Sequence, residues 1–322
     1  MLRPIHFAAI ALVAVIGFAA LPSCKKKNAV ERHEFSGERA LKYVHEVVAF
    51  GPRPAGSDAL EKSRVYIEAE LAAHGWITER QAFTKTTRLK GKVRFVNLRA
   101  RYAPDAAGEI DWNKGGGMVV VASHYDTKWF EDFEFVGAND GGSSTGALIE
   151  LAHVLAKNHP KIAKKVELVF FDGEEAFGEN IEPDDGLYGS QYYARALWRP
   201  IPAADKPSHG IVLDMIGDKD LLLTPPPNSG DGLVQLAIDC ATDLGYSDHI
   251  EPGRIAIIDD HVPLNTEARF PSTDLIDFTY GGDVGGGSFW HTRHDTLDRI
   301  SAESLEITGQ ITIEMLVRLL GE

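Results

Sequence analysis

Short apolar runs alternate with amphipathic stretches over most of the chain, and this alternation predicts its fold. The apolar runs are four to six residues long and indicate buried strands at 118–122, 166–171, 210–213 and 273–278. Longer stretches with apolar residues three and four positions apart indicate helices at 146–157, 189–198, 233–244 and 304–320. Strands that alternate with helices are typical of a mostly parallel sheet that is covered on both faces.

The region before these strands carries a different pattern. Residues 37–75 contain two amphipathic stretches separated by the turn Gly-Pro-Arg-Pro-Ala-Gly at 51–56, which predicts a pair of helices. Residues 78–86 and 92–102 alternate polar and apolar positions, which predicts an antiparallel pair of strands at a sheet edge. The predicted fold class is therefore α/β, with a mixed, mostly parallel central sheet and helices on both faces.

The first residues do not share these patterns and indicate an export signal. Arg3 precedes an apolar run at 7–20, which is shorter than a membrane span requires. The sequence Leu-Pro-Ser-Cys at 21–24 then resembles a bacterial lipobox. Residues 1–23 are therefore predicted to be a lipoprotein signal peptide, with the lipid on Cys24. The alternative is an ordinary secretory signal followed by a cysteine that has no such role.

This interpretation also sets the domain organisation and the location. Residues 24–36 begin with a cysteine and three lysines and would serve as a tether, and residues 37–322 form the catalytic domain. We expect an exported lipoprotein of the bacterial cell envelope, on its periplasmic side or outer surface, which contacts the membrane through the lipid anchor at Cys24.

Charge argues against a nucleic-acid-binding protein, and cysteine content argues against a fold held by disulfides. The formal net charge is −14, which argues against binding to nucleic acid, because such binding requires a basic face. If Cys24 is acylated, only Cys240 remains, so the fold has no internal disulfide and relies on its core. Cys240 lies among apolar residues at helical spacing, which predicts a buried structural thiol.

Polar residues follow the predicted strands repeatedly. Carboxylates and imidazoles come after successive strands or before the next helix, at His124, Asp126, Asp140, Asp172, Glu174, Glu175, Asp214, Asp259 and His291. In folds of this kind, ligands bind at the carboxyl ends of the strands. A single acidic residue after a strand is usually a cap or a turn residue, so the repetition is what indicates a site.

Histidines combined with carboxylates, and without a nearby cysteine, are typical of catalytic zinc. Such zinc takes three protein ligands and leaves a position open for water or substrate. The sequence contains no His-Glu-x-x-His motif, which excludes a match to the helix-borne zinc proteases. It also contains no Gly-x-Ser-x-Gly motif, so a serine hydrolase is poorly supported.

Together these motifs resemble the zinc-dependent M28 peptidase clan, which contains aminopeptidases and zinc-dependent glutaminyl cyclases with a phosphorylase/hydrolase-like fold. The resemblance extends from about residue 37 to the C-terminus. With the aminopeptidases as guide, it implies that Asp140 bridges two zinc ions, that Glu175 and His291 complete one site, and that His124 and Asp214 complete the other. It also implies that Glu174 is the general base.

Several stretches resemble the glutaminyl cyclases more than the aminopeptidases. They are His-Tyr-Asp-Thr-Lys at 124–128, Phe-Phe-Asp-Gly-Glu-Glu-Ala-Phe at 170–177, Asp-Asp-His-Val-Pro at 259–263 and Trp-His-Thr at 290–292. This resemblance implies one zinc ion held by residues Asp140, Glu175 and His291. It further implies that Glu174 is the acid/base and Trp290 lines the glutamine pocket. The positions Asp214 and Asp259 would form a hydrogen-bonded acidic pair.

Two enzymatic functions therefore remain open, each with N-terminal segments of peptides or proteins as substrate. We favour a glutaminyl-peptide cyclotransferase, which converts an N-terminal glutamine to pyroglutamate and releases ammonia with the help of one Zn²⁺. The alternative is a zinc-dependent M28-family aminopeptidase with two zinc ions, which the same ligand residues would serve. An inert binding module is disfavoured because Glu174 and all the ligand residues are present.

Overall fold

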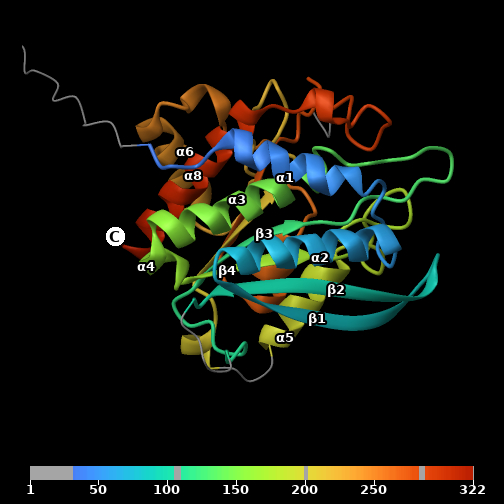
Figure 1. Cartoon of the computed structure of the whole chain (residues 1–322), viewed down its shortest axis with the longest axis horizontal. Helices are drawn as coiled ribbons and strands as arrows, with labels where there is room; N and C mark the ends of the chain where they lie inside the picture. Colours follow the sequence, from blue (N-terminus) through green and yellow to red (C-terminus); the bar gives the residue numbers. More distant parts are fainter. Residues whose placement is uncertain (1–31, 105–109, 199–201, 283–286, 322) are drawn as a thin grey trace, which may run out of the picture.

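A computed structural model of the chain describes residues 32–104, 110–198, 202–282 and 287–321 (Figure 1). The predicted signal peptide, Cys24 and the tether as far as residue 31 lie outside the described residues. Within the described residues, no helix combines the length and the apolar character that a bilayer crossing requires.

The centre of the fold is a six-stranded sheet with the order β1-β2-β4-β3-β5-β6. Its strands are β1 (Trp76–Thr87), β2 (Gly91–Tyr102), β3 (Val119–His124), β4 (Val166–Phe171), β5 (His209–Asp214) and β6 (Ser272–Ile276). The four strands β4, β3, β5 and β6 pair in parallel, and β1 and β2 form an antiparallel hairpin at one edge. The hairpin joins the rest through the antiparallel pair β2–β4. The predicted mixed, mostly parallel sheet is confirmed.

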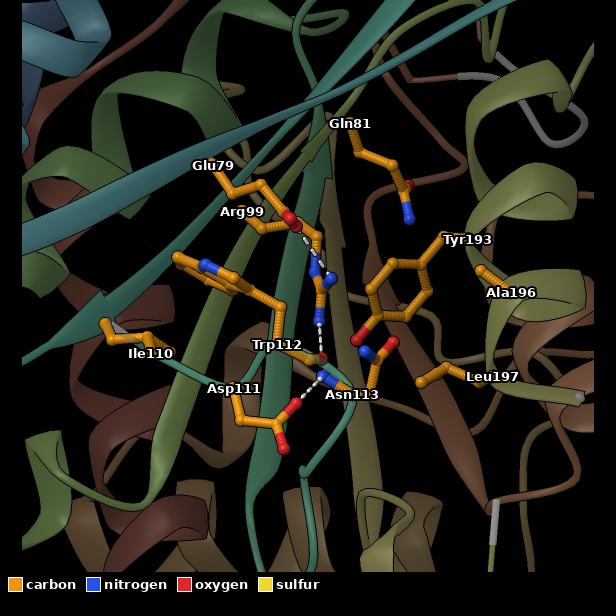
Figure 2. Close-up of a pocket in the computed structure, with 10 residues that line it drawn as sticks. All are labelled: Glu79, Gln81, Arg99, Ile110, Asp111, Trp112, Asn113, Tyr193, Ala196 and Leu197. Atoms are coloured by element: carbon orange, nitrogen blue, oxygen red, sulfur yellow. Dashed lines mark hydrogen bonds and ion pairs between the residues drawn. The ribbon is translucent and has the colours of Figure 1, made fainter. Parts of the chain in front are cut away.

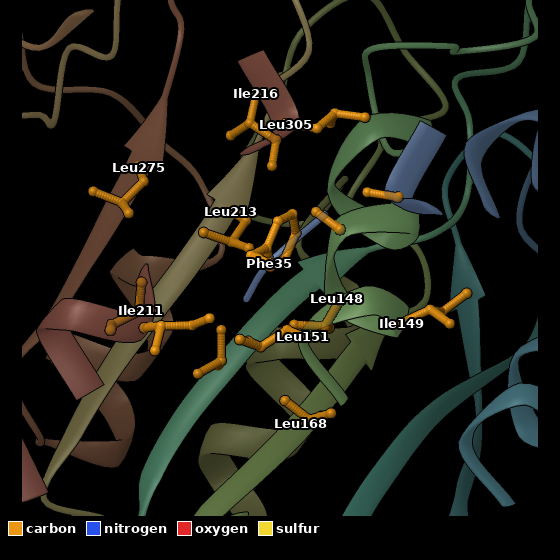
Figure 3. Close-up of a cluster of buried hydrophobic side chains, with 14 of the residues drawn as sticks. Phe35, Leu148, Ile149, Leu151, Leu168, Ile211, Leu213, Ile216, Leu275 and Leu305 are labelled. Carbon is orange, nitrogen blue, oxygen red and sulfur yellow. The ribbon is translucent and has the colours of Figure 1, made fainter. Parts of the chain in front are cut away.

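One face of the sheet is covered by the longer helices of the fold. These helices are α1 (Gly37–Ala49), α2 (Asp58–Ala73), α3 (Gly142–Asn158), α6 (Leu233–Leu244) and α8 (Ala302–Leu320). Their apolar residues form one cluster with alternate residues of the strands. Figure 3 shows part of this cluster, with Leu148 and Leu151 of α3, Leu168 of β4, and Ile211 and Leu213 of β5.

The opposite face is covered by a smaller set of helices, α5 (Tyr188–Trp198), α7 (His261–Pro263) and η3 (Leu264–Ala268). The other alternate residues of β3, β4 and β5 pack there against Tyr193, Leu197 and Leu264. Because successive side chains of a strand point to opposite faces, strands covered on both sides are apolar at nearly every position. This explains the continuous apolar runs of the sequence and confirms helices on both faces.

The remaining helices are short, and several long helices begin at a serine cap. The short ones are α4 (Pro160–Ala163), η1 (Ala203–Asp205), η2 (Ser247–His249) and η4 (Leu297–Arg299).

The side chains of Ser36, Ser57 and Ser301 accept hydrogen bonds from backbone amides of the first turns of α1, α2 and α8. Such caps satisfy amide groups that have no partner inside the helix.

Candidate metal site and active site

His124 and Asp214 end two neighbouring parallel strands, β3 and β5, and face each other. His124 Nε2 lies 3.2 Å from Asp214 Oδ1 and 3.2 Å from Asp140 Oδ1. Asp140 comes from the loop that precedes α3, and all three side chains are buried. The three residues therefore form one compact donor group, as their places after the predicted strands implied.

A second donor group shares Asp140 and adds Glu175 and His291. His291 Nε2 lies 3.4 Å from Asp140 Oδ2 and 3.3 Å from Glu175 Oε1. Glu175 follows β4, whereas His291 lies in the loop between β6 and η4. The backbone of His291 is left-handed, with φ 54°, a strained conformation for a histidine that is common at functional sites.

The two groups fit zinc because of their donor chemistry. Within each group, the nitrogen and oxygen ligand atoms lie within 4.8 Å of one another. Asp140 Oδ2 is buried without a hydrogen-bond partner, and a bound cation would provide one. Burial raises the pKa of Asp140, but His124 and His291 outweigh it and hold the pKa below its ordinary value. Histidine and carboxylate donors are the usual ligands of catalytic zinc.

A buried aspartate that the sequence analysis did not assign orients the Asp140 loop. Asp295 accepts hydrogen bonds from the backbone amides of Asn139, at 2.7 Å, and Asp140, at 3.1 Å. The hydroxyl of Tyr280 donates to the same carboxylate, at 2.8 Å. Asp295 lies four residues after His291, so its position beside that histidine was the available signal.

The turn after Asp140 brings the backbone close to His124. Gly141 has φ 76°, and a Cβ atom at this position would lie 2.9 Å from Cε1 of His124. A residue with a side chain would therefore be strained there and would collide with the imidazole. The glycine in Asn-Asp-Gly-Gly thus lets Asp140 approach the end of β3.

Asp126 connects His124 with the segment that carries Glu174. Its Oδ1 lies 3.6 Å from His124 Nδ1 and accepts a hydrogen bond of 3.2 Å from the backbone amide of Glu174. A carboxylate behind a ligand histidine orients the ring and favours its binding nitrogen. The same carboxylate therefore positions both a candidate metal ligand and the candidate acid/base residue.

Glu174 lines a cavity of about 310 Å³ together with Asp140, Glu175, Asp214 and His291. Its side chain is buried. Burial raises the pKa of Glu174 well above its ordinary value, and the carboxylate of Glu175 raises it further. A carboxyl group with a raised pKa can both accept and donate a proton near neutral pH. The adjacent glutamates therefore have different surroundings, with Glu175 beside His291.

Asp259 also lines this cavity, together with Asp214. Asp214 Oδ1 lies 3.2 Å from Nε2 of His124, and the carboxyl group of Asp259 is close to that of Asp274 on β6. Burial, followed by the charge of Asp214, raises the pKa of Asp259 to about 7. The resemblance implied a pair, and the structure places a third carboxyl group, that of Asp274, beside it.

Trp290 forms part of the cavity wall. Its ring stacks on the imidazole of His291, with centroids 3.9 Å apart and an angle of 22° between the planes. Phe278 contacts the other side of the same wall, 6.0 Å from Trp290 between centroids. The indole therefore both lines the cavity and restricts the rotation of a candidate metal ligand.

A lysine at the cavity edge was not assigned from the sequence. Lys128 is buried, and its Nζ donates a 3.0 Å hydrogen bond to the carbonyl oxygen of Ala176. The same Nζ lies 3.7 Å from Glu175 Oε2. This cation offsets part of the negative charge that Asp140, Glu174 and Glu175 concentrate here.

Another cavity, of about 550 Å³, lies away from these residues, between the β1–β2 hairpin and α5 (Figure 2). Its central cation, Arg99, donates to Glu79, to Glu167 and to the carbonyl oxygen of Trp112. These partners already satisfy the guanidinium of Arg99, which leaves it a structural role. We therefore do not assign this cavity to the active site.

The profile of peptidase family M28 matches residues 107–316 of the chain. Among curated proteins, the chain is similar to glutaminyl-peptide cyclotransferase from Drosophila melanogaster, with 32% identity over 172 residues. That match covers 52% of this chain and 46% of the fly protein, so the chain spans about half the length of this relative.

Solved structures with the same fold cover nearly the whole chain. A glutaminyl cyclase from an Acidobacteriales bacterium has a TM-score of 0.76 and 32% identity, and the match covers 90% of this chain and 96% of that one. A Zn-dependent exopeptidase from Parabacteroides distasonis has a TM-score of 0.77 and 26% identity, with coverage of 91% and 100%. The profile match and these likenesses agree with the donor groups at the strand ends, and the chain belongs to peptidase family M28.

Proposed function

We propose that the protein is a zinc-dependent glutaminyl-peptide cyclotransferase, which converts N-terminal glutamine of peptides or proteins to pyroglutamate and releases ammonia. The observation that carries this proposal is the buried Glu174 in a cavity that also contains the Asp140–Glu175–His291 group and the indole of Trp290. The similarity to a glutaminyl cyclase over 90% of the chain supports the same activity.

In this proposal, Asp140, Glu175 and His291 hold one zinc ion. When bound there, zinc supplies a Lewis acid that polarises the γ-carboxamide of the substrate. The protein residues position the substrate and move its protons. Trp290 and Ile257 form an apolar wall that keeps the glutamine side chain folded toward its own α-amine and keeps water away.

Glu174 acts as the acid/base of the reaction. Its carboxylate accepts a proton from the α-amine as the amine nitrogen forms a bond to the carbonyl carbon (Cδ) of the side-chain carboxamide. It then returns a proton to the carboxamide nitrogen, whose bond to the same carbon breaks, and ammonia leaves. The raised pKa of Glu174 suits both steps, because a weakly basic carboxylate would accept the proton poorly. Asp214 and Asp259 line the same cavity, and the negative charge of Asp259 contributes to the raised pKa of Glu174.

A second candidate function is hydrolysis of the N-terminal peptide bond by an M28-type aminopeptidase. It is favoured by the additional group of His124, Asp140 and Asp214, which would hold a second zinc ion beside the first. The likeness to a Zn-dependent exopeptidase supports the same candidate. In that case Glu174 would accept a proton from an attacking water molecule instead of an amine.

Two substrates distinguish these functions. The purified protein with zinc is incubated with a Gln-initiated peptide and, separately, with a leucine amide that carries a chromogenic leaving group. Cyclisation predicts ammonia and a mass loss of one ammonia from the first substrate, and no release from the second. Release from the second substrate alone would overturn the proposal in favour of the aminopeptidase.

We also propose that the protein is an exported lipoprotein of the bacterial cell envelope, anchored through Cys24. The support is the lipobox-like sequence at 21–24 and the lysine-containing tether that follows it. Expression of the full chain in a bacterium, followed by mass spectrometry, should show an acylated Cys24 at the N-terminus. Cys24→Ala should move the protein out of the membrane fraction, whereas Cys240→Ala should leave it there.

A further inference from the structure

A second cavity, of about 370 Å³, adjoins the one that contains Glu174. The two cavities share Ile255, Ile257 and Phe278 as wall residues. Besides this shared wall, the second cavity is lined by Leu222, Thr224 and Gly253 and by the charged residues Asp220, Glu251 and Arg254. The active-site cavity therefore continues into a groove with an apolar wall and three charged lining residues, here called the 255 groove.

Large apolar side chains are exposed at the junction of the two cavities. Ile255 is 47% exposed and Ile258 is 62% exposed. Two such residues only three positions apart, beside a binding cavity, leave apolar surface in water that a ligand would cover. Ile255 lines both cavities, so a ligand that covers it extends from the active site into the 255 groove.

The walls of the 255 groove are held in place by hydrogen bonds between two segments. The side chain of Asn228 donates to the carbonyl oxygen of Ile257, at 2.8 Å, and accepts from its amide, at 3.3 Å. Backbone amides of Glu251 and Gly253 donate to the carbonyl oxygens of Leu223 and Pro225, each at 2.9 Å. The groove is therefore preformed, and a ligand need not order it first.

Another cavity also adjoins the active-site cavity, and its junction differs in chemistry. The residues shared there are Lys128, Glu179, Asn180, Trp290 and His291, of which Lys128 and Glu179 are charged. The three residues shared with the 255 groove, in contrast, are all apolar. An apolar side chain gains free energy by leaving water for an apolar wall, and it gains less where charged groups must be buried with it. The junction with the 255 groove therefore suits an apolar side chain of the substrate better.

We propose that the 255 groove binds an apolar side chain from one of the two residues that follow the N-terminal glutamine of the substrate. This inference rests on the proposed cyclotransferase function and specifies its substrate class. The peptide must continue beyond the cavity that holds its first residue, and the shared wall makes the 255 groove a continuous path for it. Substrates with leucine, isoleucine or phenylalanine at one of these positions are therefore preferred over polar ones.

The test compares peptides that differ in one side chain of similar size. Gln-Leu-Ala-Gly is compared with Gln-Asn-Ala-Gly, and Gln-Ala-Leu-Gly with Gln-Ala-Asn-Gly, by the kcat/KM of ammonia release. Glutamine amide serves as the substrate without a following side chain. We expect the leucine peptide to be preferred about tenfold in one of the pairs, since one buried apolar side chain gives discrimination of this order.

Variants of the groove residues test whether the preference for leucine arises in the 255 groove. Ile255→Ser and Leu222→Ser should each bring the leucine-to-asparagine ratio toward one, mainly through a higher KM for the leucine peptide. Val65→Ser replaces an apolar residue of α2 that is 52% exposed, and should preserve the ratio. Equal rates within both peptide pairs, with glutamine amide cyclised, would overturn the groove alone. Failure to cyclise glutamine amide and every peptide would overturn the cyclotransferase function and the groove together.

Discussion

The buried guanidinium of Arg53 donates through Nη2 to the carbonyl oxygen of Gly137, 3.3 Å away and three residues before Asp140. Its Nη1 donates to the carbonyl oxygens of Val136, at 2.9 Å, and Gly51, at 3.0 Å. Arg53 is fully buried, and burial lowers its pKa to about 10 although nearby aspartates, Asp295 first, oppose the shift. One side chain thus connects the turn between α1 and α2 to the loop that carries Asp140, a candidate metal ligand.

Arg53→Met should weaken both stability and zinc binding. It leaves the carbonyl oxygens of Val136 and Gly137 without their donor, which costs about 3 kcal/mol of unfolding free energy. Loss of this support should also reduce zinc affinity by about tenfold or more. Urea unfolding and zinc competition with a chelator measure the two effects. Arg80→Met removes an arginine with exposed ion pairs and should change stability by about 1 kcal/mol or less. Equal zinc affinity in both variants would contradict the prediction.

Glu174→Gln should abolish most of the activity while zinc remains bound. The amide cannot accept the proton of the attacking group, so kcat should fall by about 10²-fold to 10⁴-fold. Rates are measured alongside zinc content by elemental analysis of the same samples. Glu182→Gln, an exposed residue outside the cavity, serves as the charge-matched control. Loss of zinc from Glu174→Gln would show that Glu174 is a ligand and not the acid/base residue.

The two donor groups should respond differently to loss of a histidine. If one zinc ion is held by Asp140, Glu175 and His291, then His291→Ala should release it and His124→Ala should retain it. Zinc per chain, determined after dialysis against a weak chelator, should be about one for the wild type and for His124→Ala. A wild-type content of two that falls to one in either variant would support the dinuclear aminopeptidase site instead.

His261 should make the folded state sensitive to acid. It is fully buried beside Asp274, with His261 Nδ1 3.8 Å from Asp274 Oδ2. Burial lowers the pKa of His261 to about 4, and it raises the pKa of Asp274 well above its ordinary value, so the aspartate stays neutral and cannot hold an imidazolium. Because the folded-state pKa is depressed, the unfolded chain binds more protons below about pH 6.5. The contribution of the neutral, buried His261 to the unfolding free energy is therefore fully present above about pH 6.5, and it is lost as the pH falls toward 4.

The measurement compares the wild type with His261→Gln, which does not titrate. Between pH 7.5 and pH 5 the wild type should lose about 2 kcal/mol of unfolding free energy relative to the variant. Acidic groups that titrate in the same range affect both proteins and cancel in the difference. A constant difference in urea unfolding free energy across this range would show that His261 is not held neutral by burial.

Much of the fold and most of the site could be predicted from local sequence. The apolar runs at 166–171 and 210–213 correspond to β4 and β5 with changes of at most one residue at each end. Strands covered on both faces must be apolar throughout, so these runs have few other interpretations. The residues after the strands were also predictable as a group, because parallel strands bring their carboxyl ends to one edge of the sheet.

The supporting residues were not predictable in the same way. Arg53, Asp295 and Asp274 each act through partners that are far away in the sequence. Asp295 at least follows His291 by four residues, but the sequence around Arg53 and Asp274 does not distinguish a buried charge from an exposed one. The 255 groove depends on two segments that meet only after folding. Burial and pairing over long separations are properties of the packed structure, and a pattern of spacing along the chain does not contain them.

The adjacent glutamates at 174 and 175 illustrate the difference between what the sequence determines and what only the tertiary structure determines. The sequence by itself determined that two carboxylates follow a buried strand and that histidines follow others, because the strand period and the parallel topology are local and repetitive. Only the tertiary structure decided that Asp140 turns one oxygen toward His124 and the other toward His291. It also placed Glu175 beside His291 and Glu174 in the cavity wall, since side-chain direction and desolvation arise from packing around the end of β4.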